Sequence, residues 1–248
     1  LSLANYAYPN SSFLKLKAAN VLFDTENYGL SKEILDRFSK NDLFYMDSIV
    51  EKTHAIVQIN SDKAALEYIE QSIIDGYKNA RLLKTYGSLQ RSQRLYKEAI
   101  KSYTGAIEAA KRELRTEPLW PILFLRGISF ERSKDWSLAE ADFISALKLS
   151  PDQPQILNYM GYSLLERKEK LDQAIEAYKS ALSIKPDYVE ARANLGVAFG
   201  KQNRLEEAIE AYDKVLLLLP NHVEVYNKKG DILKHQGKLD EAIETYNK

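Results

Sequence analysis

The chain has 248 residues, of which 45% are hydrophobic and 28% are charged. Its 35 Lys and Arg residues balance its 35 Asp and Glu residues, so no bulk field favours nucleic acid or an anionic membrane surface. The absence of cysteine excludes disulfides, a thiolate nucleophile and a sulfur-ligated metal, and it is compatible with a reducing or an oxidising compartment.

The apolar runs are too short to cross a bilayer, since the richest of them, residues 215–219, ends at Pro220. We therefore expect no membrane insertion. The sequence starts at Leu1 without a methionine or a signal-like segment, which favours a numbering that begins inside a larger protein. Residues 1–11 are expected to end a truncated repeat, with residues 1–8 as the tail of a helix that stops before Pro9.

A repeat with a basic period of 34 residues runs through the rest of the chain. Its first position falls at Ser12, Met46, Ala80, Trp120, Pro154, Val189 and Val223. Position 8 is occupied by Ala19, Thr53, Gly87, Gly127, Gly161, Gly196 and Gly230. Position 20 (one later in the fifth repeat) is occupied by Ser31, Ala65, Ala99, Ala139, Ala174, Ala208 and Ala242. Position 24 (likewise) is occupied by Leu35, Ile69, Tyr103, Phe143, Tyr178, Tyr212 and Tyr246. This spacing predicts two helices in each repeat.

Residues 186–220 contain the clearest unit, with a proline at each end. Gly196 should cost about 1 kcal/mol relative to alanine within a helix, so we expect another backbone to pass too close to it for a Cβ. Ala208 lies on the second helix, where a small face lets two helix axes approach closely. Pro220 should stop that helix, and Asn203 and Arg204 should form the turn between the two helices.

Two insertions interrupt the period. Six extra residues follow Ala106: residues 108–115 are expected to prolong a helix and residues 116–121 to form a long turn. One extra residue lies within residues 168–170, in a surface turn. The last repeat is cut at Lys248 without a capping helix. The repeats from Leu171 onward are close to consensus and the first two are degenerate, which predicts greater stability towards the C-terminal side and leaves open a fusion of two sources.

Because this spacing covers essentially the whole chain, the sequence resembles tetratricopeptide-repeat (TPR) proteins. Residues 123–133 and 158–163 are similar to long bacterial repeat proteins, particularly those of alphaproteobacteria. The resemblance implies an all-α fold: a single solenoid over residues 1–248, in which antiparallel helix pairs form a right-handed α-α superhelix. It also implies a concave groove that binds peptide segments of other proteins, with no enzymatic activity and no cofactor.

In that geometry, positions 2, 5, 9 and 12 of each first helix point into the groove. The resulting candidate peptide-binding residues form a cationic section and an apolar section: Arg81, Lys84, Arg91, Phe124, Ile128, Asn158, Tyr162 and Leu165. The apolar members could instead pack against neighbouring first helices, and the cations could belong to solvated helix faces. The lysine and asparagine clamp of the family is not supported, because only Lys84 occupies a clamp position and Ser88 stands where asparagine is expected.

The three histidines do not form a catalytic or metal site in the sequence. Asp231 and His235 have ligand spacing on a helix, but no third ligand is nearby, and His54 falls at a groove position of a degenerate repeat. We therefore predict no catalytic and no metal-ligating residues.

The leading hypothesis is a non-enzymatic scaffold that binds a peptide or short helix of a partner protein in the groove, with no nucleic-acid partner. One alternative is a structural module that self-associates through uncapped solenoid ends, at residues 1–9 and 242–246. Another is the docking arm of a larger enzyme. The partner and the compartment, whether bacterial cytoplasm or periplasm, stay undetermined.

Overall fold

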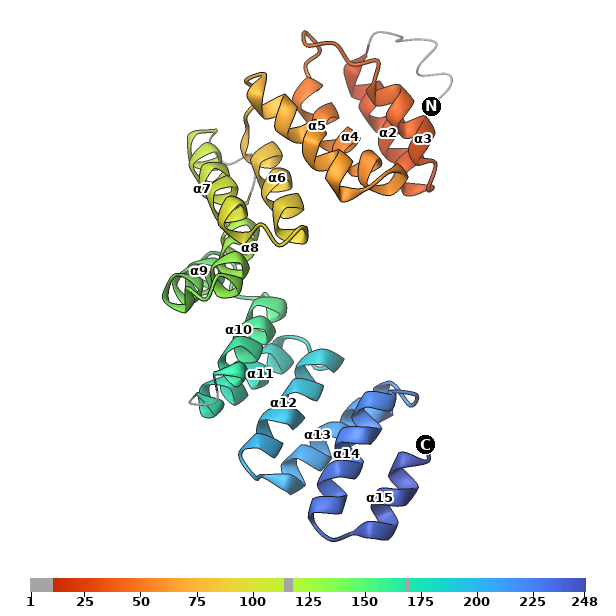
Figure 1. Ribbon diagram of the computed structural model, residues 1–248, viewed down its shortest axis with the longest axis vertical. Helices are drawn as coiled ribbons and strands as arrows, with labels where there is room; N and C mark the ends of the chain where they lie inside the picture. Colours follow the sequence, from red (N-terminus) through yellow and green to blue (C-terminus); the bar gives the residue numbers. More distant parts are fainter. Residues whose placement is uncertain (1–10, 114–117, 168–169) are drawn as a thin grey trace. The chain divides into compact units, whose positions relative to one another are not determined.

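A computed structural model describes residues 11–113, 118–167 and 170–248 and contains only helices within these ranges (Figure 1). The helical tail expected in residues 1–8, the core of the turn at residues 114–117 and the insertion at residues 168–169 lie outside the described residues. The all-α prediction is confirmed.

The chain divides into two compact units between Ser145 and Ala146. The first unit contains α2 (Ser12–Asp24), α3 (Tyr28–Leu35), α4 (Tyr45–Ile59), α5 (Asp62–Ile74), α6 (Ala80–Ser92), α7 (Tyr96–Arg112), α8 (Leu119–Arg132) and the start of α9 (Trp136–Leu149). The second contains the end of α9, then α10 (Pro154–Glu166), α11 (Leu171–Ile184), α12 (Val189–Lys201), α13 (Leu205–Leu218), α14 (Val223–His235) and α15 (Leu239–Tyr246). The single solenoid stays a prediction.

Even-numbered helices are the first helices of the repeats. Most begin at the first repeat position, while α4 and α8 begin one residue earlier, at Tyr45 and Leu119. The long turn predicted for residues 116–121 is therefore wrong at its end, because Leu119 is already helical. Pro121 lies in the first turn of α8, where a backbone N–H has no partner within the helix and its loss costs nothing. In agreement with the prediction, α7 is prolonged to Arg112.

Position 15 forms the turn between the two helices of a repeat. Its backbone is left-handed in Glu26, Arg94, Lys134 and Asn203, with φ between 60° and 67°, and in Gly237, with φ of 77°. At Asn203 the following residue, Arg204, donates its backbone N–H to the carbonyl of Phe199 at 3.0 Å, which closes the helix end. The predicted turn at Asn203 and Arg204 is confirmed.

The glycines at position 8 lie under the aromatic ring at position 24 of the same repeat. A Cβ built on Gly87 would lie 2.9 Å from the Tyr103 ring, and one on Gly196 would lie 2.6 Å from the Tyr212 ring. The same contact joins Gly127 to Phe143, Gly161 to Tyr178 and Gly230 to Tyr246. We expected a neighbouring backbone to exclude the Cβ, and this is corrected: the nearest group is a side-chain ring.

The small residues at position 20 are buried. Ala65, Ala99, Ala139, Ala174 and Ala208 are fully inaccessible, and Ala242 is nearly so. Ser31, which takes this position in the first repeat, donates its hydroxyl to the carbonyl of Ala19 at 2.8 Å. A buried hydroxyl therefore has its hydrogen bond satisfied across the helix pair.

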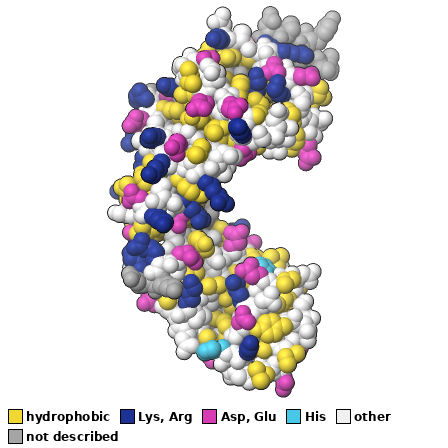
Figure 2. Space-filling view, in the orientation of Figure 1, with side chains coloured by type: hydrophobic (Ala, Val, Ile, Leu, Met, Phe, Trp, Pro, Cys, Tyr) yellow, Lys and Arg dark blue, Asp and Glu magenta, His cyan; other side chains and the backbone are white. Residues whose placement is uncertain are grey.

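Acidic and basic side chains are mixed over the face shown in Figure 2. Several form pairs one helical turn apart, such as Lys214 with Glu210 at 2.6 Å and Lys228 with Glu224 at 3.1 Å. Such exposed pairs contribute little to stability. None of the helices in the described ranges is both long and apolar enough to cross a membrane.

Candidate functional site

Among the described residues, first helices of successive repeats line a hollow in each unit. We call them the first hollow, formed mainly by α4 and α6, and the second hollow, formed by α10, α12 and the start of α14. Most of their residues occupy positions 2, 5, 9 and 12 or their immediate neighbours. This follows from helix geometry, because residues three or four apart share one face.

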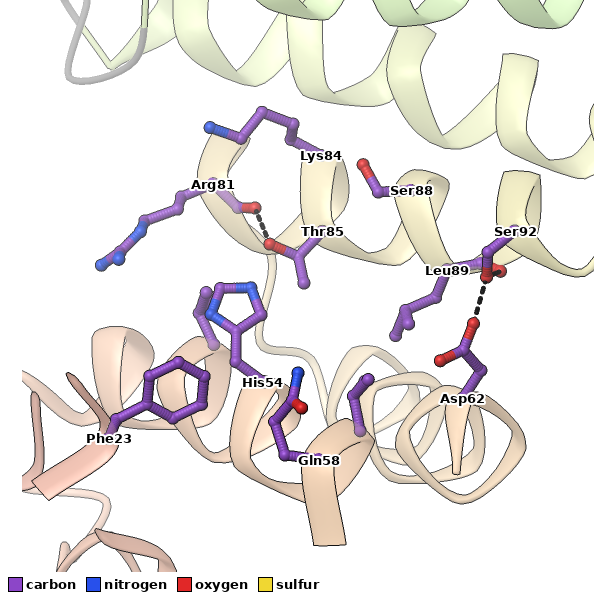
Figure 3. Close-up of a pocket in the computed structure, with 12 residues that line it drawn as sticks. Phe23, His54, Gln58, Asp62, Arg81, Lys84, Thr85, Ser88, Leu89 and Ser92 are labelled. Atoms are coloured by element: carbon purple, nitrogen blue, oxygen red, sulfur yellow. Dashed lines mark hydrogen bonds between the residues drawn. The ribbon is translucent and has the colours of Figure 1, made fainter. Parts of the chain in front are cut away.

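The first hollow has a volume of about 540 Å³ (Figure 3). Its apolar part is lined by Phe23, Val50, Val57 and Leu89. Its polar part is lined by His54, Gln58, Asp62, Arg81, Lys84, Thr85, Ser88 and Ser92. Apolar walls with a few convergent polar groups and this volume are typical of a ligand site.

Arg81 is held by acidic side chains of the preceding repeat. Its guanidinium donates to Asp47 Oδ1 at 2.7 Å and to Glu51, and Glu51 Oε2 lies 3.4 Å from His54 Nδ1. Burial would raise the pKa of Glu51, but the hydrogen bond with His54 and the charge of Arg81 outweigh it and lower that pKa. The Arg81 charge is thus partly balanced within the protein, and this network also fixes the wall of the first hollow.

Lys84 and Ser88 line the first hollow one turn apart on α6, whereas Arg91 is directed towards Tyr103. The Tyr103 hydroxyl hydrogen-bonds with Ser88 at 3.1 Å, and Arg91 lies near enough to lower its pKa. Burial raises the pKa of Tyr103, and Ser88 and Arg91 oppose that shift. Of the cations predicted for the groove, Arg81 and Lys84 therefore line one hollow, and Arg91 supports the core tyrosine beside it.

Phe124 packs against α9, and Ile128 is nearly buried. The Phe124 ring is 5.9 Å from the ring of Phe143, and Ile128 is only 9% exposed. A nearly buried isoleucine offers little surface to a partner.

The second hollow has a volume of about 420 Å³ and includes Tyr162 and Leu165. Tyr162 is 36% exposed, whereas Leu165 is 3% exposed and forms part of the floor. Charged residues surround this floor: Glu166, Glu190, Lys201, Glu224 and Lys228.

Asn158 lies beside the second hollow and links two first helices. Its Oδ1 accepts a hydrogen bond from Asn194 Nδ2 at 3.2 Å, and its Nδ2 donates to the Tyr188 hydroxyl at 3.4 Å. Asn194 itself lines the second hollow. The predicted residues are thus divided between the units: Arg81, Lys84, Arg91, Phe124 and Ile128 in the first, Asn158, Tyr162 and Leu165 in the second.

Sequence reasoning missed several residues of the first hollow, including Phe23, Val57 and Gln58. Phe23 and Val57 occupy position 12 of the two degenerate repeats, so applying the same positions to those repeats would have found them.

Asp231, which has ligand spacing with His235, accepts a hydrogen bond from the Tyr246 hydroxyl at 2.7 Å. No group of three or more His, Asp or Glu side chains among the described residues could hold a metal ion.

Comparison with known proteins agrees with this geometry. Family models described as TPR repeat or tetratricopeptide repeat match residues 167–203, 189–222 and 211–244. These matches show that residues 167–244 contain tetratricopeptide repeats, and helix pairs with the same packing positions continue back to Ser12.

Solved structures share the fold at low sequence identity. A tetratricopeptide repeat protein from Parabacteroides merdae is 14% identical with a TM-score of 0.70, and the match covers 96% of this chain and 91% of that one. YrrB, described as a TPR protein with an unusual peptide-binding site, is 19% identical with a TM-score of 0.57, over 73% of this chain and 90% of that one. MamA from Desulfovibrio magneticus RS-1 is 22% identical with a TM-score of 0.59, over 68% and 91%. These likenesses concern the fold alone.

Proposed function

We propose that the protein is a non-enzymatic scaffold whose first-helix face binds a peptide or a short helix of a partner protein. The observation that carries this proposal is that hollows of about 540 and 420 Å³ open on the same repeat positions in both units. Each combines apolar side chains with convergent polar groups, which is how a peptide is anchored and oriented. The match of residues 189–222 to the tetratricopeptide repeat and the peptide-binding description of YrrB add support.

The proposal gives the candidate residues different roles. Lys84 and His54 on the rim of the first hollow contact the peptide, and Tyr162 offers an exposed ring in the second. Leu165 forms the floor, while Arg81 holds the wall through Asp47 and Glu51. Aromatic rings of this kind often dominate the affinity of protein interfaces.

The test begins with peptides selected on the immobilised chain and measures their affinity for variants by fluorescence anisotropy. Lys84→Glu should lower the affinity for peptides that bind in the first hollow by about tenfold or more. Tyr162→Ala should do the same for peptides that bind in the second hollow. The matched controls are Lys97→Glu and Leu217→Ala, which change exposed residues of second helices and should alter affinity less than about twofold. Unchanged affinity in both hollow variants, with unchanged circular dichroism, would refute this location.

Self-association is a second candidate, favoured by exposed apolar side chains on α15. Ile243 is 59% exposed, whereas its counterpart in α11, Ile175, is 2% exposed. An apolar stripe of this kind suits a second protein surface. Light scattering over a range of concentrations tests it: Leu239→Lys with Ile243→Lys should keep the mass at that of a monomer if the unsubstituted chain associates through α15. A constant monomeric mass of the unsubstituted chain would remove this candidate.

A further inference from the structure

We propose that a third hollow, lined by α6 and α7 on the side away from the first hollow, binds an acidic segment of a partner protein that carries an apolar side chain. This hollow has a volume of about 650 Å³. Its residues from α6 are Leu83 and Tyr86, which lie roughly opposite Arg81, Lys84 and Ser88 at about 100° per residue. The proposal therefore concerns a different surface from the proposed function and does not depend on it.

Gly105 lines the third hollow and has no packing role within the protein that would require a glycine. It lies within α7, where glycine is less favourable than alanine. The glycines at position 8 are explained by the rings above them, but a Cβ on Gly105 would only meet Leu83 Cδ1 at 3.5 Å, an ordinary contact. Packing within the protein thus does not require this glycine.

Other repeats carry a side chain where Gly105 stands. Position 26 is occupied by Arg37, Gln71, Ser145, Ser180, Lys214 and Lys248 in the other repeats, with the one-residue shift in the fifth. The missing side chain in the third repeat keeps the wall between Leu83 and Ala109 open. A glycine at such a place lets another molecule approach the helix closely.

The charges around the third hollow favour an acidic occupant. Lys78, Lys101 and Arg112 line it, and within the described ranges none of them forms an ion pair with another residue. Glu113 is the acidic group in the lining, and its carboxylate accepts the backbone N–H of Ala80 at 3.2 Å. The hollow thus offers three positive side chains against one carboxylate that is already hydrogen-bonded.

The apolar part of the lining explains why the occupant should also carry a hydrophobic side chain. Ile73 and Leu83 face this space together with Ala109, and Gly105 adds an open strip of backbone. A leucine or phenylalanine of the partner would fill the strip, while its neighbouring carboxylates reach the cations at the rim. Apolar anchors with charged neighbours are the usual composition of a short recognition segment.

The experiment measures binding of a fluorescein-labelled peptide in which glutamates alternate with leucines. Gly105→Leu should fill the hollow, and Lys101→Glu with Arg112→Glu should reverse its charge, and each should weaken binding by about tenfold or more. Gly105→Ala is the folding control, since it adds only an ordinary contact and should raise the melting temperature. Lys148→Glu, which reverses an exposed charge of α9 outside all three hollows, should leave the affinity within about twofold.

Three results would overturn the proposal. The first is no binding of the acidic peptide by the unsubstituted protein up to about 1 mM. The second is a loss of affinity of about tenfold in Lys84→Glu with no loss in Gly105→Leu. That result would place the peptide in the first hollow and would leave the proposed function standing. The third is tighter binding of labelled oligothymidine than of the acidic peptide, with the same dependence on Lys101 and Arg112, which would make the surface a nucleic-acid site.

Discussion

The first two repeats and the later ones differ in the residues that pack the two helices of a repeat together at positions 8 and 24. In the first two, Ala19 and Thr53 stand at position 8, with Leu35 and Ile69 at position 24. In the later repeats a glycine at position 8 receives an aromatic ring from position 24, as Gly196 does from Tyr212. In the later repeats the side chain at position 8 is smaller and the side chain at position 24 is larger. The helix pair stays packed, because a core tolerates exchanges that conserve the total side-chain volume.

Polar contacts also join helices within the first repeat and between the second and third repeats. Arg81 joins α6 to Asp47 and Glu51 of α4, and Ser31 bonds the carbonyl of Ala19 within the first pair. In the later repeats Tyr178 is fully buried and Tyr212 almost so, and burial raises the pKa of both hydroxyls. The comparison teaches that degenerate and consensus repeats differ in the chemistry of their pairing more than in the helices they form.

The largest expected effect comes from adding a methyl group to a glycine of the later repeats. In Gly196→Ala the new Cβ would lie 2.6 Å from the Tyr212 ring, so the ring or a helix must shift. Overpacking of this kind should reduce the free energy of unfolding by about 1–3 kcal/mol. Urea denaturation measures it.

The matched control lies one turn further along the same helix. A Cβ on Gly200 would meet Ile232 Cδ1 at 3.7 Å, an ordinary contact. Gly200→Ala should be neutral or stabilising by up to about 1 kcal/mol. Equal losses in the two variants would show that the ring contact is not the cause.

A second substitution should convert a later pair into an early one. Gly196→Ala with Tyr212→Leu reproduces the Ala19 and Leu35 combination of the first repeat. The double variant should lose less stability than the sum of its single variants, with a coupling of about 0.5–3 kcal/mol. A thermodynamic double-mutant cycle from urea denaturation gives this value, and strict additivity would contradict the exchange of volume between the helices.

Acid should affect the early network more than the exposed pairs of the later repeats. The pKa of Glu51 is lowered from its ordinary value of 4.5, so its stabilisation is present above that pH and is lost as the pH falls through the lower folded value. Glu51→Gln should therefore reduce the free energy of unfolding by about 1 kcal/mol at pH 7, and the stability of this variant should decline less in acid.

Glu210→Gln is the control for Glu51→Gln. Glu210 pairs with Lys214, but the two side chains are 65% and 50% exposed, so the pair should contribute little. Denaturation curves between about pH 3 and pH 7 compare the two variants. If the free energy of unfolding depends on pH in the same way in the unsubstituted chain and in Glu51→Gln, Glu51 does not contribute to the loss of stability in acid.

The smallest effect concerns the left-handed turns. Arg94 has φ of 61°, and Gly237 takes the same turn position in the last repeat with φ of 77°. Arg94→Gly should stabilise by less than about 1 kcal/mol, and Gly237→Ala should destabilise by about 1 kcal/mol. Thermal unfolding should move the two melting temperatures in opposite directions, and a shift in the same direction would contradict a conformational origin.

The sequence predicted the helices well because each repeat position carries one constant requirement. Alanine at position 20 is buried and the turn at Asn203 is left-handed, and both follow from local rules of packing and backbone geometry. The reason for glycine at position 8 was predicted less well. The sequence shows that space is needed there but not whether a backbone or the Tyr212 ring fills it, because that depends on the side-chain direction from the second helix.

The candidate site was predictable in its positions and less so in the state of each residue. Lys84 and Tyr162 line hollows as the family geometry implies. The sequence could not show that Ile128 is nearly buried, that Arg91 turns to Tyr103, or that Arg81 is paired with the preceding repeat. These depend on contacts between helices that are tens of residues apart, which no single repeat encodes.

Hydrogen exchange with a selected peptide bound tests the central claim most directly. If the first-helix face is the binding surface, exchange should slow in α4 and α6 for a peptide in the first hollow, or in α10 and α12 for one in the second, and should stay unchanged in α13. Protection confined to second helices such as α13, with none in these first helices, would contradict the account.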